Sequence, residues 1–401
     1  MTAATEKTWF EQAEQQEEWR DEGEFFDESI NPRDEKVYVA SYWQLMWWRF
    51  LKHRMAVIGG IVIILLYMVA IFAEFVAPYN PDPHPSELFV QYKLAPPTRV
   101  HIFDDNWTLQ WPFVYKLTQE RDPETLRRVY TEDKSEKYPL RFFVEGPEYE
   151  MWGLFSSQRH LFGLGPEAGD QGLFLLGVDE GARDLFTRIC FGARISLTIG
   201  LVSVVISLIL GIILGGISGY YGGTADNVIQ RVIEFIRSVP EIPLIMALAA
   251  ALPADWPVVR LYFGITVLLS FVGWTGLARV VRGRFLSLRE EDFVMAARLS
   301  GSSEQRIILR HMLPSFLSHI IASLTLSIPG IILSETGLSF IGLGLRPPAI
   351  SWGVLLQDAQ KVKTVALAPW LLIPALAVII TVLAFNFLGD GIRDAADPYA
   401  K

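Results

Sequence analysis

The chain has 401 residues, 51% of them hydrophobic, and a mean hydropathy of +0.29. A soluble domain of this length normally carries more charge and fewer long apolar runs, so the composition excludes an ordinary soluble protein. The formal net charge of −9 is largely local, because residues 1–36 hold 12 acidic and 4 basic residues.

The N-terminal segment, 1–37, is too acidic to bury much apolar area and is expected to be a disordered cytoplasmic tail. A docking segment is the alternative interpretation. Residues 38–54 then mix aromatic side chains with a basic end, and Trp43, Trp47 and Phe50 recur at helical spacing. This pattern predicts an interfacial helix whose tryptophans lie among the lipid headgroups, with a plain extension of the first span as the alternative.

Long apolar runs predict membrane spans, because about 20 apolar residues in a helix cross a bilayer core of roughly 30 Å. A sixth crossing is expected near 232–252, where Glu234, Arg237 and Glu241 weaken the signal. The pattern therefore predicts an all-α polytopic membrane protein with six transmembrane helices, the first over 55–77. The five stronger runs are 55–73, 195–225, 261–278, 311–334 and 364–389.

Basic residues indicate the orientation of these spans. Arg49, Lys52 and Arg54 surround the start of the first span, and arginines are frequent between the fourth and fifth spans. By the positive-inside rule, both termini are expected in the cytoplasm, including the C-terminal segment 395–401. No cleavable signal peptide is expected, and Cys190, the only cysteine, allows no disulfide within the chain.

The segment 78–190 separates the first two spans and is rich in proline and mixed charge. Short alternating stretches at 107–113 and 141–144 resemble strand fragments between turn residues. We expect a small mixed-structure extracytoplasmic insertion. Its aromatic residues are expected to form its own core rather than a ligand platform. They are Trp107, Trp111, Phe142, Phe143, Trp152 and Phe155.

No motif for catalysis, for a P-loop or for a metal site occurs in the sequence, so the chain is not expected to be an enzyme or to bind ATP or a metal. A carboxylate inside a membrane span is a functional candidate by default. Glu335 is therefore a candidate for the substrate pathway. The equal alternative is a structural acceptor at a helix end, flanked by Ser334, Thr336 and Ser339.

The cytoplasmic loop 289–314 (REEDFVMAARLSGSSEQRIILRHMLP) is the most informative segment. Good helix formers fill 291–299, and Gly301 stands where such a helix would stop. A following serine could cap a second helix through 307–312. A short helix with a small-residue face can bind in a groove of a partner protein, so the loop is a candidate docking segment. An ordinary amphipathic connector is the alternative.

The spacing of Ala296, Ala297, Gly301 and Pro314 resembles the cytoplasmic coupling loop of ATP-binding-cassette (ABC) importer permeases. More narrowly, the chain resembles the second, C-type permease of the dipeptide/oligopeptide/nickel branch, over 41–80 and 172–401. Eight blocks carry this resemblance in the expected order: LGVDEGARD (176–184), FGARIS (191–196), GYYGGTAD (219–226), ARVVR (278–282), RHMLP (310–314), ETGLSFIGLG (335–344), PPAISWG (347–353) and NFLGDGIRD (386–394).

The chain also departs from the family pattern. Met295 replaces an acidic residue of the wider family, which the peptide branch tolerates. Val178 and Ala182 alter the usual G-T-D-x-x-G-R-D pattern, and the insertion over 81–171 is longer than in most peptide permeases.

The resemblance implies the type I permease fold of ABC importers, with a permease core over 191–394 and a coupling loop over 283–314. Through this loop, closure of an ATPase pair would turn the spans from inward-facing to outward-facing. The residues assigned to this coupling are Ala296, Ala297, Gly301, Arg310 and Pro314.

The resemblance further implies a second permease subunit as a heterodimer partner, two ATPase subunits that bind ATP and magnesium, and an extracytoplasmic solute-binding protein. The expected location is the plasma (inner) membrane of a bacterium or archaeon. The lipid bilayer is an expected partner of the chain, and nucleic acid is not. The solute is a peptide or a similar small molecule, with an opine, an oligosaccharide or a metal chelate left open. The alternatives are a membrane-anchored sensory or assembly protein and an ion-coupled transporter, which would require inverted repeats.

Overall fold

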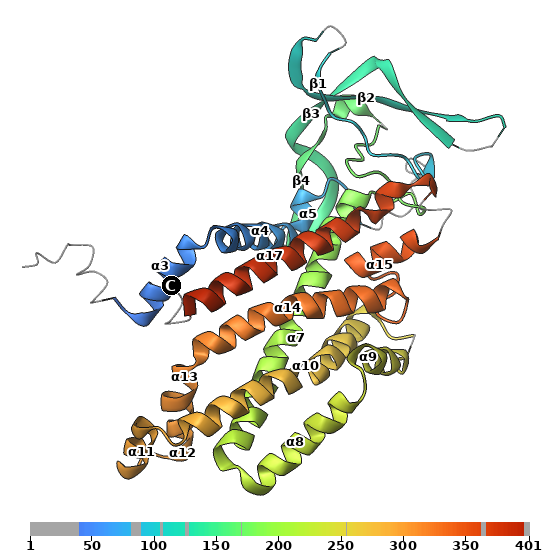
Figure 1. The fold of residues 1–401 in the computed structure, drawn as a ribbon. Helices are drawn as coiled ribbons and strands as arrows, with labels where there is room; N and C mark the ends of the chain where they lie inside the picture. The colour runs from blue at the N-terminus through green and yellow to red at the C-terminus, as the bar shows by residue number, and fades with distance from the viewer. Residues whose placement is uncertain are drawn as a thin grey trace, which may run out of the picture. The chain divides into compact units, whose positions relative to one another are not determined.

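The computed structural model describes residues 40–81, 90–104, 107–124, 128–169, 171–253, 255–361 and 366–396 (Figure 1). The acidic tail and most of the C-terminal segment 395–401 lie outside these ranges. Contacts divide the chain into two units, Met1–Arg49 and Phe50–Lys401. Helix α3 (Tyr42–Lys52) occupies the place of the expected interfacial helix.

Five helical segments among the described residues are long and apolar enough to cross a bilayer, and each overlaps one of the five apolar runs. They are α4 (Arg54–Ile71), α7 (Leu185–Tyr221), α10 (Val258–Leu288), α14 (Leu317–Phe340) and Pro369–Ala396, which joins η4 (Pro369–Leu372) to α17 (Ile373–Ala396).

The first and second spans have other bounds than the sequence indicates. Helix α4 ends at Ile71, because the backbone leaves the helix at Phe72 before the short helix α5 (Ala73–Val76). Helix α7 begins at Leu185, inside the segment expected as insertion. Asp184 caps this helix by accepting a 2.8 Å hydrogen bond from the Thr187 amide.

The region near 232–252 contains two shorter helices, α8 (Gly223–Ser238) and α9 (Glu241–Ala250). Val239 between them is extended, the conformation that a following proline favours. Pro240 then occupies the N-cap position of α9, where its missing N–H has no consequence. The break places Arg237 in the last turn of α8 and Glu241 in the first turn of α9.

Helices α7 and α10 pack side by side through glycines (Figure 1). A Cβ on Gly215 would lie 2.5 Å from the Ala278 carbonyl oxygen, and one on Gly219 would lie 2.7 Å from the Arg282 carbonyl oxygen. Only glycine therefore permits this approach of the two backbones. The glycine-rich segment of α7 serves packing within this subunit.

Helices α4, α7, α14 and α17 share one apolar core, in which α17 lies beside α4 and α14 (Figure 1). Trp352 of the short helix α15 (Trp352–Gln357) is fully buried in this core. Its indole Nε1 donates a 3.1 Å hydrogen bond to the Ile189 carbonyl of α7.

Between α5 and α7 lies an antiparallel sheet of four strands in the order β1 (His101–Phe103), β2 (Leu109–Arg121), β3 (Arg128–Met151) and β4 (Phe155–Leu164). The first part of β3 pairs with β2 and its second part with β4. The expected strand fragments overlap β2 and β3.

The expectation that six aromatic residues form the core of this sheet is wrong, because all six side chains are exposed. Buried positions are instead filled by residues such as Val114 and Phe162, together with Leu173 from the segment that leads into α7. A sheet can leave one face and its hairpin ends without a covering layer. The exposed aromatic residues are Trp107, Trp111, Phe142, Phe143, Trp152 and Phe155.

Candidate functional site

The expected coupling loop begins with α11 (Asp292–Leu299), since residues 283–288 still belong to α10. The helix ends in a left-handed turn at Gly301, whose φ is +76°. Two hydrogen bonds close this turn, from the Gly301 amide to the Arg298 carbonyl and from the Ser302 amide to the Ala297 carbonyl. Glycine reaches this conformation without the steric cost that a Cβ adds, which explains its position here.

The second half of the loop is less regular than two α-helices would be. The helix α12 (Glu304–Arg306) continues as the π-helical η2 (Ile307–Met312), and α13 (Leu313–Ser315) contains Pro314. Ser303 occupies the N-cap position of α12, but its side chain makes no capping hydrogen bond. π-Helical turns occur often at functional sites.

One face of the loop packs onto the ends of the membrane helices. Its buried side chains join Tyr220 of α7 and Phe285 of α10 in one apolar cluster, so the loop is attached to the spans by burial. The loop residues buried in this cluster are Val294, Ala297, Ile307 and Met312.

The opposite face carries apolar side chains that this chain leaves uncovered. Leu299 is 88% exposed, the largest fraction among the large hydrophobic side chains of this face. We call this surface the coupling face; it consists of Phe293, Met295, Ala296, Leu299 and Leu309. The two alanines of the sequence pattern therefore differ, since Ala296 belongs to the exposed face and Ala297 to the buried one. Arg310 and Pro314 are also exposed.

Polar contacts also fix the loop to the helix ends. The Tyr221 hydroxyl donates to Glu304 Oε2 at 2.9 Å, and the Arg298 guanidinium lies 5.4 Å from the centre of the Tyr220 ring. A displacement of the loop must therefore act on the end of α7 as well.

A cavity of about 830 Å³ lies between α7, α8, α9, α10 and α14. Arg237 and Glu241, on the two sides of the helix break, both line it. Ser323, Ser327 and Ser334 line it from one side of α14. The cavity thus combines two opposite charges with hydroxyl groups in an otherwise apolar surrounding.

No residue of such a cavity was predicted from the sequence. The signal that could have located it is the proline between two charged residues inside a weak apolar span, because interrupted membrane helices often form solute sites. Pro240 has Arg237 before it and Glu241 directly after it.

Glu335 is fully buried at the junction of α7, α14 and α15. It accepts hydrogen bonds from the hydroxyl groups of Ser339 at 2.9 Å, Ser351 at 2.8 Å and Ser196 at 3.4 Å. It is not among the residues that line the cavity. This geometry favours the structural acceptor over the substrate-pathway role.

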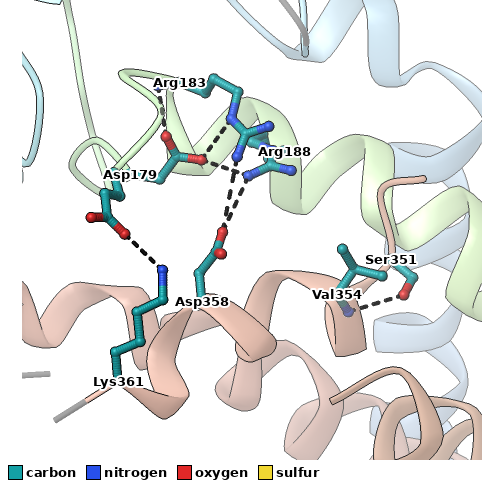
Figure 2. A network of polar contacts seen from close by, with 8 residues as sticks. Asp179, Arg183, Arg188, Ser351, Val354, Asp358 and Lys361 are labelled. Carbon is teal, nitrogen blue, oxygen red and sulfur yellow. Dashed lines mark hydrogen bonds and ion pairs between the residues drawn. The ribbon is translucent and has the colours of Figure 1, made fainter. Parts of the chain in front are cut away.

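A network of ion pairs joins the LGVDEGARD block to the end of α15 (Figure 2). Arg188 is only 2% exposed, and its guanidinium donates to Asp179 Oδ2 at 2.5 Å. Asp179 also accepts a 2.8 Å hydrogen bond from Arg183 Nε. Asp358 lies 3.9 Å from both arginines, and burial raises its pKa above the ordinary value. A buried pair of this kind depends on each partner, because removal of one leaves an uncompensated charge.

The backbone of the same block shows why the family pattern has glycine at position 182. Ala182, where the pattern has glycine, adopts a left-handed φ of +62°. The position favours glycine because a Cβ is strained there.

Among the residues that the structure describes, no group of three histidine, cysteine or acidic residues could hold a metal ion.

Two family models match the chain. The model of the "Binding-protein-dependent transport system inner membrane component" matches residues 194–401. That of the "N-terminal TM domain of oligopeptide transport permease C" matches residues 41–97.

Among curated relatives, the oligopeptide transport system permease protein OppC of Escherichia coli K12 is 42% identical over 228 residues, which are 55% of this chain and 71% of the relative. The glutathione transport system permease protein GsiD of Escherichia coli O6:K15:H31 is 32% identical over 364 residues, 90% of this chain and 92% of the relative. A solved structure of the inward-facing MetNI methionine ABC transporter aligns with a TM-score of 0.42 at 18% identity, covering 53% of this chain and 98% of that chain.

Proposed function

The chain belongs to the family of binding-protein-dependent transport system inner membrane components, and we propose that it imports peptides or similar small solutes as one permease of a two-permease pathway. It is a membrane permease subunit of an ABC importer. In this proposal ATP and magnesium bind to separate ATPase subunits, and an extracytoplasmic binding protein delivers the solute.

The coupling face is the observation that carries the ATPase assignment. An exposed apolar surface on a loop between two membrane spans is suited to binding a partner protein, since contiguous exposed apolar patches mark interaction sites. The opposite side of the same loop packs on α7 and α10. A partner that moves the loop would therefore move the spans. Ala296, Gly301, Arg310 and Pro314 contribute to this contact in the proposal, while Ala297 supports it from inside.

The proposed pathway follows the cavity at the break between α8 and α9. The sixth membrane crossing runs over about residues 232–252 in this proposal, across the break between the two helices, with both termini in the cytoplasm. Arg237 is the candidate for binding the carboxylate of a solute, because guanidinium groups form strong charge-assisted hydrogen bonds with carboxylates. Its Nε already donates to Thr275 Oγ1 at 3.1 Å, which orients the group toward the cavity that both residues line.

The insertion sheet is the candidate for contact with the binding protein, because it lies in the extracytoplasmic segment between the first two spans. Deletion of residues 82–171 tests this role. Unchanged delivery of solute from the binding protein after this deletion would remove the sheet from the contact.

The test of the proposed function is purification of the chain from its native membrane in a mild detergent, followed by mass spectrometry of the stoichiometric partners. One second permease and ATPase chains are expected. Recovery with signalling proteins and without an ATPase would instead support the sensory alternative.

A further inference from the structure

The turn between β3 and β4 lies against the end of the first membrane span. The Trp152 indole Nε1 donates a 2.8 Å hydrogen bond to the carbonyl oxygen of Ile71, the last residue of α4. The Trp152 ring centre lies 5.7 Å from that of Phe72, and the Phe143 and Phe75 ring centres are 6.1 Å apart. Two places on this hairpin thus contact consecutive parts of the chain, the end of α4 and the short helix α5 that follows it.

Charged groups beside this helix end mark the boundary of the hydrocarbon core. Arg194 forms a 2.6 Å ion pair with Glu74, and its Nε donates to the Ala70 carbonyl at 3.0 Å. Burial alone would raise the pKa of Glu74, but the hydrogen bonds from Arg194 and from the backbone outweigh it and hold the pKa below its ordinary value. Charged pairs of this kind belong outside the hydrocarbon, so Ile71 and Trp152 lie at its edge.

At this depth the hairpin exposes a cluster of large apolar side chains, which we call the hairpin tip: Phe143, Trp152, Leu154 and Phe155. The tip adjoins the exposed apolar side of α4, where Met68 and Ile71 are uncovered near the helix end. A membrane span presents such a side to lipid. The exposed apolar surface of the hairpin therefore continues that of the span.

The backbone of the turn indicates that this placement is specific. Trp152 has a φ of +54° and Gly153 a φ of +68°, and the Leu154 amide donates to the Met151 carbonyl at 3.0 Å. A turn with two left-handed residues usually contains asparagine or aspartate before glycine. A tryptophan there is strained, and strain of this kind is typical of functional positions.

We propose that the hairpin tip rests in the phospholipid headgroup region on the side of the bilayer that carries the insertion. Tryptophan suits this place, since its ring is apolar and its N–H needs a polar partner. Glu148 and Glu150 are exposed on the adjoining part of β3. The charge next to the tip is thus negative, which suits a zwitterionic rather than an anionic lipid surface. The tip fixes the height of the sheet above the membrane.

The test uses two leucines with the same exposed fraction, 74%, on the same sheet domain: Leu154 in the tip and Leu109 at the start of β2. Each is replaced separately, as Leu154→Cys and Leu109→Cys, and labelled with a nitroxide in the full-length chain. Cys190 is buried and should not react. The labelled protein is reconstituted with its accompanying subunits into phosphatidylcholine vesicles.

Oxygen concentrates in the bilayer, whereas a charged nickel chelate stays in water, so the two relaxants report the depth of the label. At position 154 we expect a higher ratio of oxygen to chelate relaxation than at position 109, because the headgroup region partly excludes the chelate and is richer in oxygen than bulk water. Equal ratios at the two positions would overturn the proposal. Protection of position 154 from both relaxants would overturn it as well, because protein would then cover the tip.

Discussion

Arg282 donates two hydrogen bonds to Asp226, of 2.5 and 2.6 Å, and this pair joins α10 to the start of α8. Ser218 of α7 donates a third hydrogen bond to the same carboxylate. The hydrogen bond from Arg282 is the main cause that holds the pKa of Asp226 below its ordinary value of 3.8. Three helices thus meet at one carboxylate beside the coupling loop.

Reversal of one charge in this pair should destabilise the protein, and reversal of both should restore part of the loss. For Asp226→Arg we expect a loss of about 1–3 kcal/mol in the free energy of unfolding, the usual range for hydrogen bonds to charged groups. Adding Arg282→Asp recreates an ion pair. Denaturant unfolding in detergent measures both variants, and a double variant no more stable than Asp226→Arg would contradict the pairing.

Because the folded pKa of Asp226 is lowered, its stabilisation is present above pH 3.8 and disappears as the pH falls through the folded pKa.

Leu299 is expected to bind the ATPase without supporting the fold of the permease. Leu299→Ser should leave the unfolding free energy within about 0.5 kcal/mol, since the side chain is exposed. Its loss from a partner interface should weaken ATPase binding by about 1–2 kcal/mol, roughly 5- to 30-fold. Recovery of ATPase subunits with a tagged permease measures the effect.

Val294 on the same helix provides the contrast, because it is fully buried. Val294→Ser should cost about 1–3 kcal/mol of stability through the unpaired buried hydroxyl. Normal ATPase recovery with Leu299→Ser would remove the coupling face from the docking site.

Substitutions of Gly301 distinguish the need for a left-handed turn from the need for free space beside a partner protein. Asparagine tolerates its left-handed backbone, whereas alanine there should cost about 1 kcal/mol. A Cβ at this position meets no atom of the described chain within 4 Å. Gly301→Arg should therefore reach the membrane but abolish ATP-driven uptake, because its bulk meets the partner. Gly301→Asn should retain uptake, and Gly301→Ala should lose little uptake. Full uptake by Gly301→Arg at normal subunit levels would exclude docking at this turn.

Arg237 is expected to act on solute passage rather than on assembly. Arg237→Gln should reduce uptake of peptides with a free C-terminal carboxylate by roughly 10- to 100-fold, the factor that corresponds to one charged hydrogen bond. ATP hydrolysis stimulated by the binding protein should persist. Arg231→Gln is the matched control on the same helix, since Arg231 is 83% exposed and pairs only weakly with Glu234 at the surface. Equal losses of uptake in Arg237→Gln and Arg231→Gln would contradict the proposed role. Equal uptake of amidated and free peptides by the wild type would contradict it as well.

The spans were predictable because hydropathy is a local property of the sequence, and each long apolar run overlaps a helix. The turn at Gly301 was predictable for a similar reason, because one residue type fits its backbone. The roles of Ala296 and Ala297 were not separable, since burial of one of them depends on where α7 and α10 end.

The cases that the sequence left open or predicted wrongly depend on long-range geometry. The hydroxyl groups around Glu335 come from Ser196 of α7, Ser339 of α14 and Ser351, the N-cap residue of α15. The alternation of residues in the insertion indicated strands, but not which face of the sheet is covered. The aromatic residues at the hairpin end were therefore misassigned to a core.

Asp184 should make the stability of the protein depend on pH near neutrality. Its Oδ2 caps α7, its Oδ1 has no hydrogen-bond partner in the described structure, and burial raises its pKa from 3.8 to about 7. The folded state thus holds the proton more tightly than the unfolded state. The free energy of unfolding should fall as the pH rises from about 4 to 7, by at most about 1.4 kcal/mol per pH unit.

Asp184→Asn isolates this effect, because asparagine keeps an oxygen for the cap and carries no charge. The variant should show a flatter stability profile between about pH 5 and 7 and should be more stable than the wild type above pH 7. Asp184→Ala also removes the charge but loses the cap, which costs about 1 kcal/mol at every pH. Thermal unfolding in detergent across this range measures all three proteins. An asparagine variant with the wild-type slope would show that another group is responsible for the pH dependence.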